Sequence, residues 1–187
     1  ERTLAMLSGA MDTLVVGDPA DPATDVGPVI DRAAYDRLMG YRSEIRARWL
    51  KTIPAPARGC FVPPTLIGID AIEDLGREWF GPLLHVTTWP AGALAETVER
   101  VNASGYGLTM GLHSRIARAA ETVEDHARAG NLYVNRSMIG AVVGVQPFGG
   151  EQKSGTGPKA GGPLYLRALV RRAEAGNDAV RPGLTAG

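Results

Sequence analysis

A glycine-rich stretch, residues 135–166, constrains the fold of this chain more than any other feature. It reads NRSMIGAVVGVQPFGGEQKSGTGPKAGGPLYL. Flexible linkers are monotonous in glycine and serine, whereas these glycines alternate with bulky apolar and specific polar residues. Such alternation is typical of backbone that turns tightly and approaches a ligand closely. The residues interleaved with the glycines include Asn135, Arg136, Gln146, Phe148 and Lys153.

The rest of the sequence predicts an α/β fold. Apolar residues spaced three to four apart indicate helices, and short β-branched or aromatic runs indicate strands. The expected helices span residues 2–14, 31–49 with Asp31 as the N-cap, 94–101, and 114–129 with Ser114 as the N-cap. The expected strands span residues 65–69, 83–89, 108–113 and 132–134. Strands that alternate with helices favour a mostly parallel sheet flanked by helices.

Composition excludes several classes of protein. Twenty basic and twenty acidic residues balance, which argues against a nucleic-acid-binding surface. No apolar run is long enough to cross a membrane and the first residues show no signal-peptide pattern, so we expect a cytoplasmic protein. The single cysteine, Cys60, excludes an internal disulfide and fits a reducing compartment. Three widely spaced histidines show no metal-ligand pairing, and we expect no metal site.

Several motifs occur in an order that resembles one family. They are VGDP and DVGPVID (within 16–31), FVPPTLIGID (61–70), EWFGPLLHV (78–86), GYGLTMGLHSR (105–115), GNLYVNR (130–136) and QPFGGEQKSGTG (146–157). The ordered set resembles the catalytic domain of the aldehyde dehydrogenase superfamily. IGAVVGVQPFGG and GTGPKAGGPLYL narrow the resemblance to the L-glutamate γ-semialdehyde dehydrogenase group, in the form found in bifunctional proline-catabolic flavoproteins. The resemblance covers roughly residues 1–172 and implies that family's α/β fold, with the Rossmann cofactor domain outside this chain.

The EWFGP segment carries the implied cofactor contacts. By resemblance, Glu78 accepts hydrogen bonds from the hydroxyls of the nicotinamide ribose of NAD, and Phe80 packs near the nicotinamide. An ionised carboxylate suits a diol because charge-assisted hydrogen bonds are stronger than neutral ones. The alternative is a surface acid ahead of a Gly-Pro turn and a core aromatic. Trp79 departs from the smaller apolar residue usual at its position, so local packing is expected to differ.

The IGAVVG loop and the QPFGG segment carry the implied substrate contacts. By resemblance, the backbone N–H groups of Gly140 and Ala141 bind the carboxylate of the aldehyde substrate, since small residues let amides converge on an anion. Phe148 forms an aromatic wall beside the aliphatic chain of the substrate. The alternatives are a buried apolar loop and a core phenylalanine. Asn135 is expected to be structural, and Arg136 to offset substrate charge or to form an ion pair.

No catalytic residue is expected in this chain. The family nucleophile is a cysteine in a G-Q-x-C-S type turn, and Cys60 lies instead in RGCFVPPT. The resemblance places the nucleophile and the general base upstream of Glu1. Because the chain begins with Glu1 rather than Met, we expect a piece of a longer protein that is inactive alone.

The implied domain organisation has three parts. Residues 1–163 form the distal part of the catalytic domain, residues 164–173 an oligomerisation strand, and residues 174–187 a flexible tail or linker. Leu164, Tyr165 and Leu166 are the expected contacts of a homo-oligomer, together with Leu169, because an apolar strand with open backbone groups is otherwise prone to aggregate.

The implied reaction is the NAD-dependent oxidation of L-glutamate 5-semialdehyde to L-glutamate in proline breakdown. FAD is expected only if a proline dehydrogenase domain lies upstream. Two alternatives remain open: an aldehyde dehydrogenase of other substrate specificity, and a catalytically dead aldehyde-dehydrogenase-like module that serves assembly. The retained Glu78, Phe80 and QPFGG segment argue against the dead module, which needs none of them.

Overall fold

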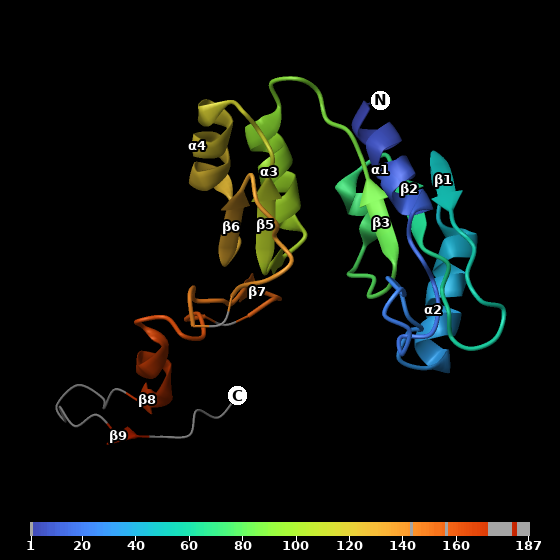
Figure 1. The fold of residues 1–187 in the computed structure, drawn as a ribbon. Coiled ribbons are helices and arrows are strands. Elements are labelled where there is room, and N and C mark those ends of the chain that lie inside the picture. The colour runs from blue at the N-terminus through green and yellow to red at the C-terminus, as the bar shows by residue number, and fades with distance from the viewer. Residues whose placement is uncertain (1, 143, 156, 172–180, 183–187) are drawn as a thin grey trace. The chain divides into compact units, whose positions relative to one another are not determined.

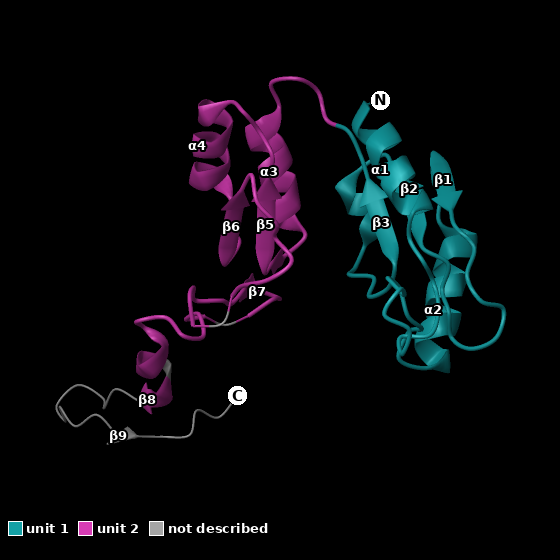
Figure 2. Ribbon diagram, viewed as in Figure 1, with its two compact units in different colours: residues 1–88 teal, residues 89–187 magenta. Residues whose placement is uncertain are grey.

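The computed structural model describes residues 2–142, 144–155, 157–171 and 181–182. The chain divides into two compact units, residues 1–88 and 89–187, which Figure 2 colours separately. The sequence analysis predicted no boundary at this position. Figure 1 names the elements of each unit.

Unit 1 contains a three-stranded sheet with two helices. Its elements are α1 (Arg2–Asp12), α2 (Arg32–Glu44), β1 (Trp49–Thr52), β2 (Thr65–Gly68), the 3-10 helix η1 (Ile72–Leu75) and β3 (Leu83–Val86). The strand order is β1-β2-β3, with β1 antiparallel and β3 parallel to β2. All four residues of β2 are buried, as expected of a central strand covered on both faces.

The core of unit 1 joins α1 to the sheet. Met11 of α1 packs with Ile53 and Leu66, and Leu7 and Val86 pack against this cluster. Leu38 on α2 is fully buried. The apolar spacing that predicts these helices therefore corresponds to the faces that contact the sheet.

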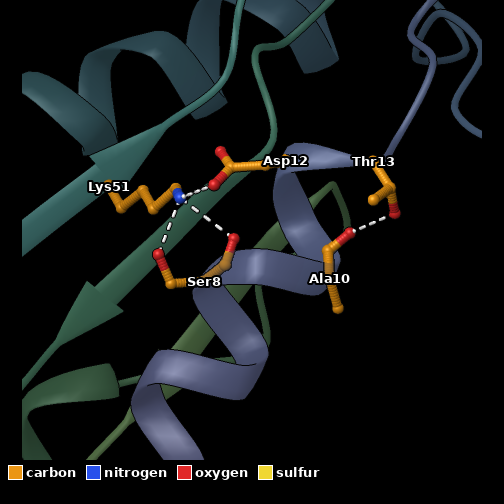
Figure 3. Close-up of polar contacts among 5 residues, drawn as sticks. All are labelled: Ser8, Ala10, Asp12, Thr13 and Lys51. Carbon is orange, nitrogen blue, oxygen red and sulfur yellow. Dashed lines mark hydrogen bonds and ion pairs between the residues drawn. The ribbon is translucent and has the colours of Figure 1, made fainter.

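A lysine fastens the end of α1 to β1. The Nζ atom of Lys51 donates to the carbonyl oxygen of Ser8 at 2.9 Å and to its hydroxyl at 2.6 Å, and lies 2.6 Å from Asp12 Oδ2 (Figure 3). Ser8 and Asp12 lie in the last turns of α1, where a cation is favourable beside the negative end of the helix dipole. Lys51 therefore stabilises both the end of α1 and its contact with the sheet.

Unit 2 is built around a β-α-β motif. Its longer elements are α3 (Leu94–Ala103), β5 (Thr109–Leu112), α4 (Ala117–His126) and β6 (Asn131–Val134). Strands β5 and β6 pair in parallel, with Thr109 opposite Asn131 and Leu112 opposite Val134. Shorter elements are β4 (Tyr106–Gly107), β7 (Glu151–Gln152), the 3-10 helix η2 (Tyr165–Leu169), β8 (Val170–Arg171) and β9 (Arg181–Pro182).

Helices α3 and α4 lie side by side (Figure 1) and are joined through Asn102. The buried Asn102 side chain donates to the carbonyl oxygen of His126 at 2.8 Å and accepts from the backbone N–H of Arg128 at 2.9 Å. Beside it, Nδ1 of His126 lies 3.1 Å from Oε1 of Glu99, within hydrogen-bond distance. The hydrogen bond from His126, and a second from Asn102, lower the pKa of the Glu99 carboxyl. This polar contact fixes the end of α4 just before β6 begins.

Most of the expected elements are confirmed, as is the α/β class. Asp31 caps α2: its side chain accepts from the backbone N–H of Ala34 at 2.7 Å. The expectation that the helix reaches Trp49 is wrong. The chain becomes extended at Ile45, and Trp49 pairs with Gly68, where a Cβ would overlap its indole ring. The antiparallel β1 makes the sheet of unit 1 mixed, with one antiparallel and one parallel pairing, where a mostly parallel sheet was expected.

The fourth helix is shorter than expected at both ends. Ser114 lies ahead of α4, and its backbone N–H donates to Asn135 Oδ1 at 2.9 Å. Gly130 does not end the helix, which stops at His126. The backbone N–H of Gly130 donates to the carbonyl oxygen of Gly107, and a Cβ at Gly130 would overlap the carbonyl oxygen of Gly149. Glycine is needed here for close backbone approach rather than for a helix cap.

The expected strand over residues 164–173 differs from the structure in its first part. Tyr165–Leu169 form a turn of 3-10 helix, and the strand itself is Val170–Arg171, which pairs antiparallel with β9. Leu164 is 52% exposed and Leu166 is 73% exposed. Residues 172–180 and 183–187, which include most of the expected tail, lie outside the described residues. The role of residues 164–166 in oligomers stays a prediction.

Candidate functional site

The first set of candidate residues lies on the loop between η1 and β3 in unit 1. Glu78 and Phe80 are exposed, and Phe80 is 75% exposed. Trp79 between them is half-buried. Phe80 is therefore not buried within this unit, whereas the exposed Glu78 also agrees with the alternative of a surface acid. The contacts of Glu78 and Phe80 with NAD stay a prediction.

Helix α2 and strand β3 support this loop through Tyr41. The Tyr41 ring stacks on Trp79 with ring centroids 3.7 Å apart, and its hydroxyl lies 2.8 Å from Nε2 of His85. Burial raises the pKa of Tyr41, helped by the negative charge of Asp74. Burial also lowers the pKa of His85. A neutral imidazole at this position can accept the hydrogen bond that the Tyr41 hydroxyl donates.

The second set of candidates lies between β6 and β7 in unit 2. Asn135, at the end of β6, adopts a left-handed conformation (φ 55°). Its side chain bonds both backbone groups of Ser114, so it is structural as expected. The guanidinium of Arg136 lies over the Tyr133 ring, 5.1 Å from its centroid. This contact differs from both expected roles of Arg136, charge offset and ion pair.

Most described residues of the IGAVVG loop (139, 140, 142 and 144) are exposed to solvent. Ile139 is 94% exposed and Val142 is 58% exposed. A Cβ added at Gly140 would meet no atom within 4 Å, so the surrounding structure does not require glycine there. Most of the described loop residues are thus exposed within the unit, and the binding of a carboxylate by this loop stays a prediction.

The structure brings Ala141 and Phe148 to one hollow of about 460 Å³. The other lining residues are Gly144, Val145, Gln146, Pro147, Ala160 and Gly161. The backbone of Phe148 pairs with that of Ala160 through two hydrogen bonds of 3.2 and 3.1 Å. Gly140 directly precedes Ala141 but does not line the hollow. The arrangement can hold a short aliphatic chain with a polar group at the loop end.

Two residues for which no role was predicted hold the segment that lines this hollow. Asn131 is 8% exposed; its amide donates to the carbonyl oxygen of Pro147 at 3.0 Å and accepts from the backbone N–H of Gly149 at 3.3 Å. Gln146 donates to the Tyr133 hydroxyl at 3.0 Å. An asparagine at the start of the otherwise apolar and aromatic run NLYV is a sequence signal for a polar contact at Asn131, although it does not specify the partners.

The glycines after Phe148 form a close-packed turn. A Cβ at Gly150 would overlap the carbonyl oxygen of Ser154, and one at Gly155 would lie 2.6 Å from the carbonyl oxygen of Gly150. The Ser154 hydroxyl accepts from the backbone N–H of Gly107 at 3.0 Å. The turn contains β7, which pairs antiparallel with β4, so it holds the segment after Phe148 against β4. The expected tight turning of the glycine-rich stretch is thus confirmed here.

Cys60 lies on the loop between β1 and β2 in unit 1 and is partly buried. Its carbonyl oxygen accepts from the backbone N–H of Val29 at 2.9 Å.

Among the described residues, no group of three or more histidine, cysteine or acidic side chains could hold a metal ion. No helix in the described part of the chain is long and apolar enough to span a membrane.

The two candidate sets lie in different units, Glu78 and Phe80 in unit 1 and Gly140, Ala141 and Phe148 in unit 2. Each set combines exposed functional groups with a backbone fixed by buried neighbours. The partly apolar hollow of unit 2, with polar groups beside it, is the kind of feature expected of a small-molecule site.

The chain belongs to the aldehyde dehydrogenase family, whose model matches residues 1–173. The bifunctional protein PutA of Klebsiella aerogenes is 49% identical over 181 residues, covering 91% of this chain and 14% of that protein. The 1-pyrroline-5-carboxylate dehydrogenase of Bacillus subtilis is 39% identical over 161 residues, covering 82% of this chain and 30% of that protein.

Solved structures agree with these relatives. A mutant of proline utilization A from Bradyrhizobium japonicum superposes with a TM-score of 0.83 at 49% identity, over 88% of this chain and 17% of that one. A 1-pyrroline-5-carboxylate dehydrogenase from Thermus with bound NAD superposes with a TM-score of 0.76 at 33% identity, over 89% of this chain and 33% of that one. The chain therefore spans about one seventh to one third of the length of these relatives.

Proposed function

We propose that this chain forms part of an NAD-dependent aldehyde dehydrogenase that oxidises L-glutamate 5-semialdehyde to L-glutamate in the cytoplasm. The observation that carries the proposal is the hollow of about 460 Å³ where Ala141 and Phe148 meet below the open glycine loop. Similarity to 1-pyrroline-5-carboxylate dehydrogenases at 39–41% identity supports the same substrate.

In this proposal the substrate carboxylate is held by backbone N–H groups at Gly140 and Ala141. Both residues are small, and the space beside Gly140 is open, so an anion can reach the backbone there. The Phe148 ring contacts the methylene groups of the substrate and excludes water from them. This chain thus binds and orients the aldehyde.

Glu78 and Phe80 fit the ribose and nicotinamide of NAD by their chemistry and exposure. A carboxylate accepts two hydrogen bonds from a ribose diol, and an exposed aromatic ring can pack on a flat heterocycle. NAD, when bound, accepts the hydride of the aldehyde carbon.

Proline utilization A relatives are bifunctional by name. We propose FAD only for a complete protein that also carries a proline dehydrogenase domain.

We place the nucleophilic thiolate and the general base outside these 187 residues. The only cysteine of the sequence, Cys60, is partly buried on a loop whose backbone bonds Val29. A thiolate attack on the aldehyde needs an accessible sulfur beside a base. The chain alone is therefore expected to form no NADH from the semialdehyde and NAD.

The substrate assignment is tested in the complete protein by Gly140→Leu. The substituted side chain covers the proposed carboxylate site, so KM for the semialdehyde should rise about tenfold or more, which corresponds to losing one strong ionic contact. KM for a neutral aldehyde of similar length should change far less. Gly40→Leu on α2 is the matched control, because a Cβ there also meets no atom within 4 Å.

Three other results of these kinetic measurements would contradict the proposal. Equal KM changes for both aldehydes would indicate a dehydrogenase of other specificity. A complete protein that forms no NADH with any aldehyde would be a dead module that serves assembly. Normal kinetics of Gly140→Leu would refute the carboxylate anchor.

We also propose a homo-oligomer that forms through Leu164, Tyr165 and Leu166. Their side chains are 52%, 42% and 73% exposed, and apolar patches of this kind are typical of protein interfaces. Replacing Leu164 and Leu166 with asparagine should reduce the mass measured by analytical ultracentrifugation. The same mass at the same concentration would contradict this interface.

A further inference from the structure

The EWFGP segment is held at two points that flank Phe80. On one side, Trp79 stacks on Tyr41 of α2, with the rings inclined by only 15°. On the other side, Gly81 abuts the fully buried Leu38 of the same helix: a Cβ at Gly81 would lie 2.5 Å from Leu38 Cδ1. Phe80 lies between these two contacts and is 75% exposed.

Besides its stack on Tyr41, Trp79 makes a hydrogen bond and a cation–π contact. Its indole Nε1 donates to the carbonyl oxygen of Leu75 at 3.1 Å, which fixes the segment to the end of η1. The guanidinium of Arg77 lies 4.2 Å from the indole ring centroid. A smaller apolar side chain could make neither the indole hydrogen bond nor the ring stack.

The partner of Trp79 is itself fixed. The Tyr41 hydroxyl lies 2.8 Å from Nε2 of His85, which is on β3. The contacts of Trp79 therefore extend from α2 to the sheet within one unit. The Trp79 ring is stacked on one face and hydrogen-bonded at its edge, so it has little rotational freedom. The backbone at residue 79 is restrained with it.

We propose that Trp79 is a positioning residue for the cofactor: its stack on Tyr41 holds the backbone so that Glu78 and Phe80 face outward together. The proposal rests on the function proposed above, in which Glu78 and Phe80 contact NAD. Two flanking groups held before the cofactor arrives need no ordering on binding, which raises affinity. Trp79 itself does not contact NAD in this proposal.

The test uses the complete protein with Trp79→Leu and Trp79→Phe. Without NAD, hydrogen exchange of the amides of residues 78–81 should become about 3- to 10-fold faster in Trp79→Leu, the effect of losing one aromatic pair. The dissociation constant for NAD, measured by calorimetry, should rise by a similar factor. Trp79→Phe keeps a stacking ring and should recover most of both effects.

Trp89→Leu is the matched control, since it makes the same change at a tryptophan that is 52% exposed in unit 2. It should leave both measurements unchanged. Unchanged exchange at residues 78–81 in Trp79→Leu would overturn the positioning role, whatever happens to NAD binding.

Glu78→Gln separates this proposal from the proposed function. If Glu78→Gln weakens NAD binding and Trp79→Leu does not, the positioning role is overturned and the cofactor contact stands. If neither variant weakens NAD binding, both are overturned. Equal loss in Trp79→Leu and Trp79→Phe would also refute a role for the ring stack.

Discussion

Replacing Gly130 with alanine tests whether close backbone packing supports the candidate substrate hollow. The added Cβ would overlap the carbonyl oxygen of Gly149, and would lie 2.7 Å from its carbonyl carbon and 3.0 Å from Gly150 Cα. These are backbone atoms, which cannot rotate away as a side chain does. The 149–150 segment must therefore move by roughly 1 Å relative to β6.

The expected loss of stability in Gly130→Ala follows from the known cost of adding a methyl group to a packed interior. Forcing a methyl group into a filled interior costs about 1–3 kcal/mol. Because about 1.4 kcal/mol is a factor of ten, amides of β6 that exchange through local opening should exchange about 5- to 150-fold faster. The Gly130 amide is a suitable reporter, since it donates to the carbonyl oxygen of Gly107 at 2.9 Å.

The assay is hydrogen exchange of the complete protein, read by mass spectrometry on peptides that cover residues 105–113 and 128–135. Gly140→Ala provides the control, since it adds the same methyl group in open space. Its exchange in these peptides should match the unsubstituted protein. Equal exchange in Gly130→Ala and Gly140→Ala would refute the argument that backbone overlap makes glycine necessary at residue 130.

Three further perturbations test the supporting contacts. Asn131→Ala removes both bonds to segment 147–149 and leaves its groups unpaired; we expect a loss of about 1–3 kcal/mol, seen as faster amide exchange there, and unaltered exchange would contradict it. Lys51→Met should cost about 1 kcal/mol, because its partner carboxylate is largely exposed, with faster exchange confined to α1. Burial lowers the pKa of His85 in the folded state. As the pH drops below about 6.5, the unfolded state therefore binds a proton before the folded state does, and the free energy of unfolding decreases. His85→Gln keeps an acceptor for the Tyr41 hydroxyl and should reduce that acid sensitivity; identical pH profiles of unfolding would exclude His85 as its source.

Local signals in the sequence predicted most helices and strands correctly. Asp31 caps α2 because an aspartate side chain reaches the backbone three residues later, a contact that needs no distant partner. The Trp49 error has the opposite cause. Its spacing from Ile45 continues a helical pattern, but pairing with Gly68 in β2 prevails.

Elements that depend on distant pairing gave no such signal. Strands β4 and β7 have two residues each, and Tyr106 pairs with Gln152 across 46 positions of sequence. Runs this short have no periodicity to read. Similarly, the contribution of Asn131 depends on the segment 147–149 returning to the start of β6, which no local pattern specifies.

The glycine-rich stretch shows why a sequence pattern can indicate a binding segment without assigning each residue. Gly150 has no room for a side chain, so the fold alone explains glycine there. A Cβ at Gly140 would meet no atom within 4 Å, and the residue is not in the left-handed region, so neither packing within the unit nor strain explains this glycine. Among these glycines, only one that the fold does not require can owe its identity to a ligand, and that distinction needs the structure. On this argument Gly140 is the glycine to which the proposed ligand contact is best assigned, whereas the glycines of the turn after Phe148 are explained by close backbone packing.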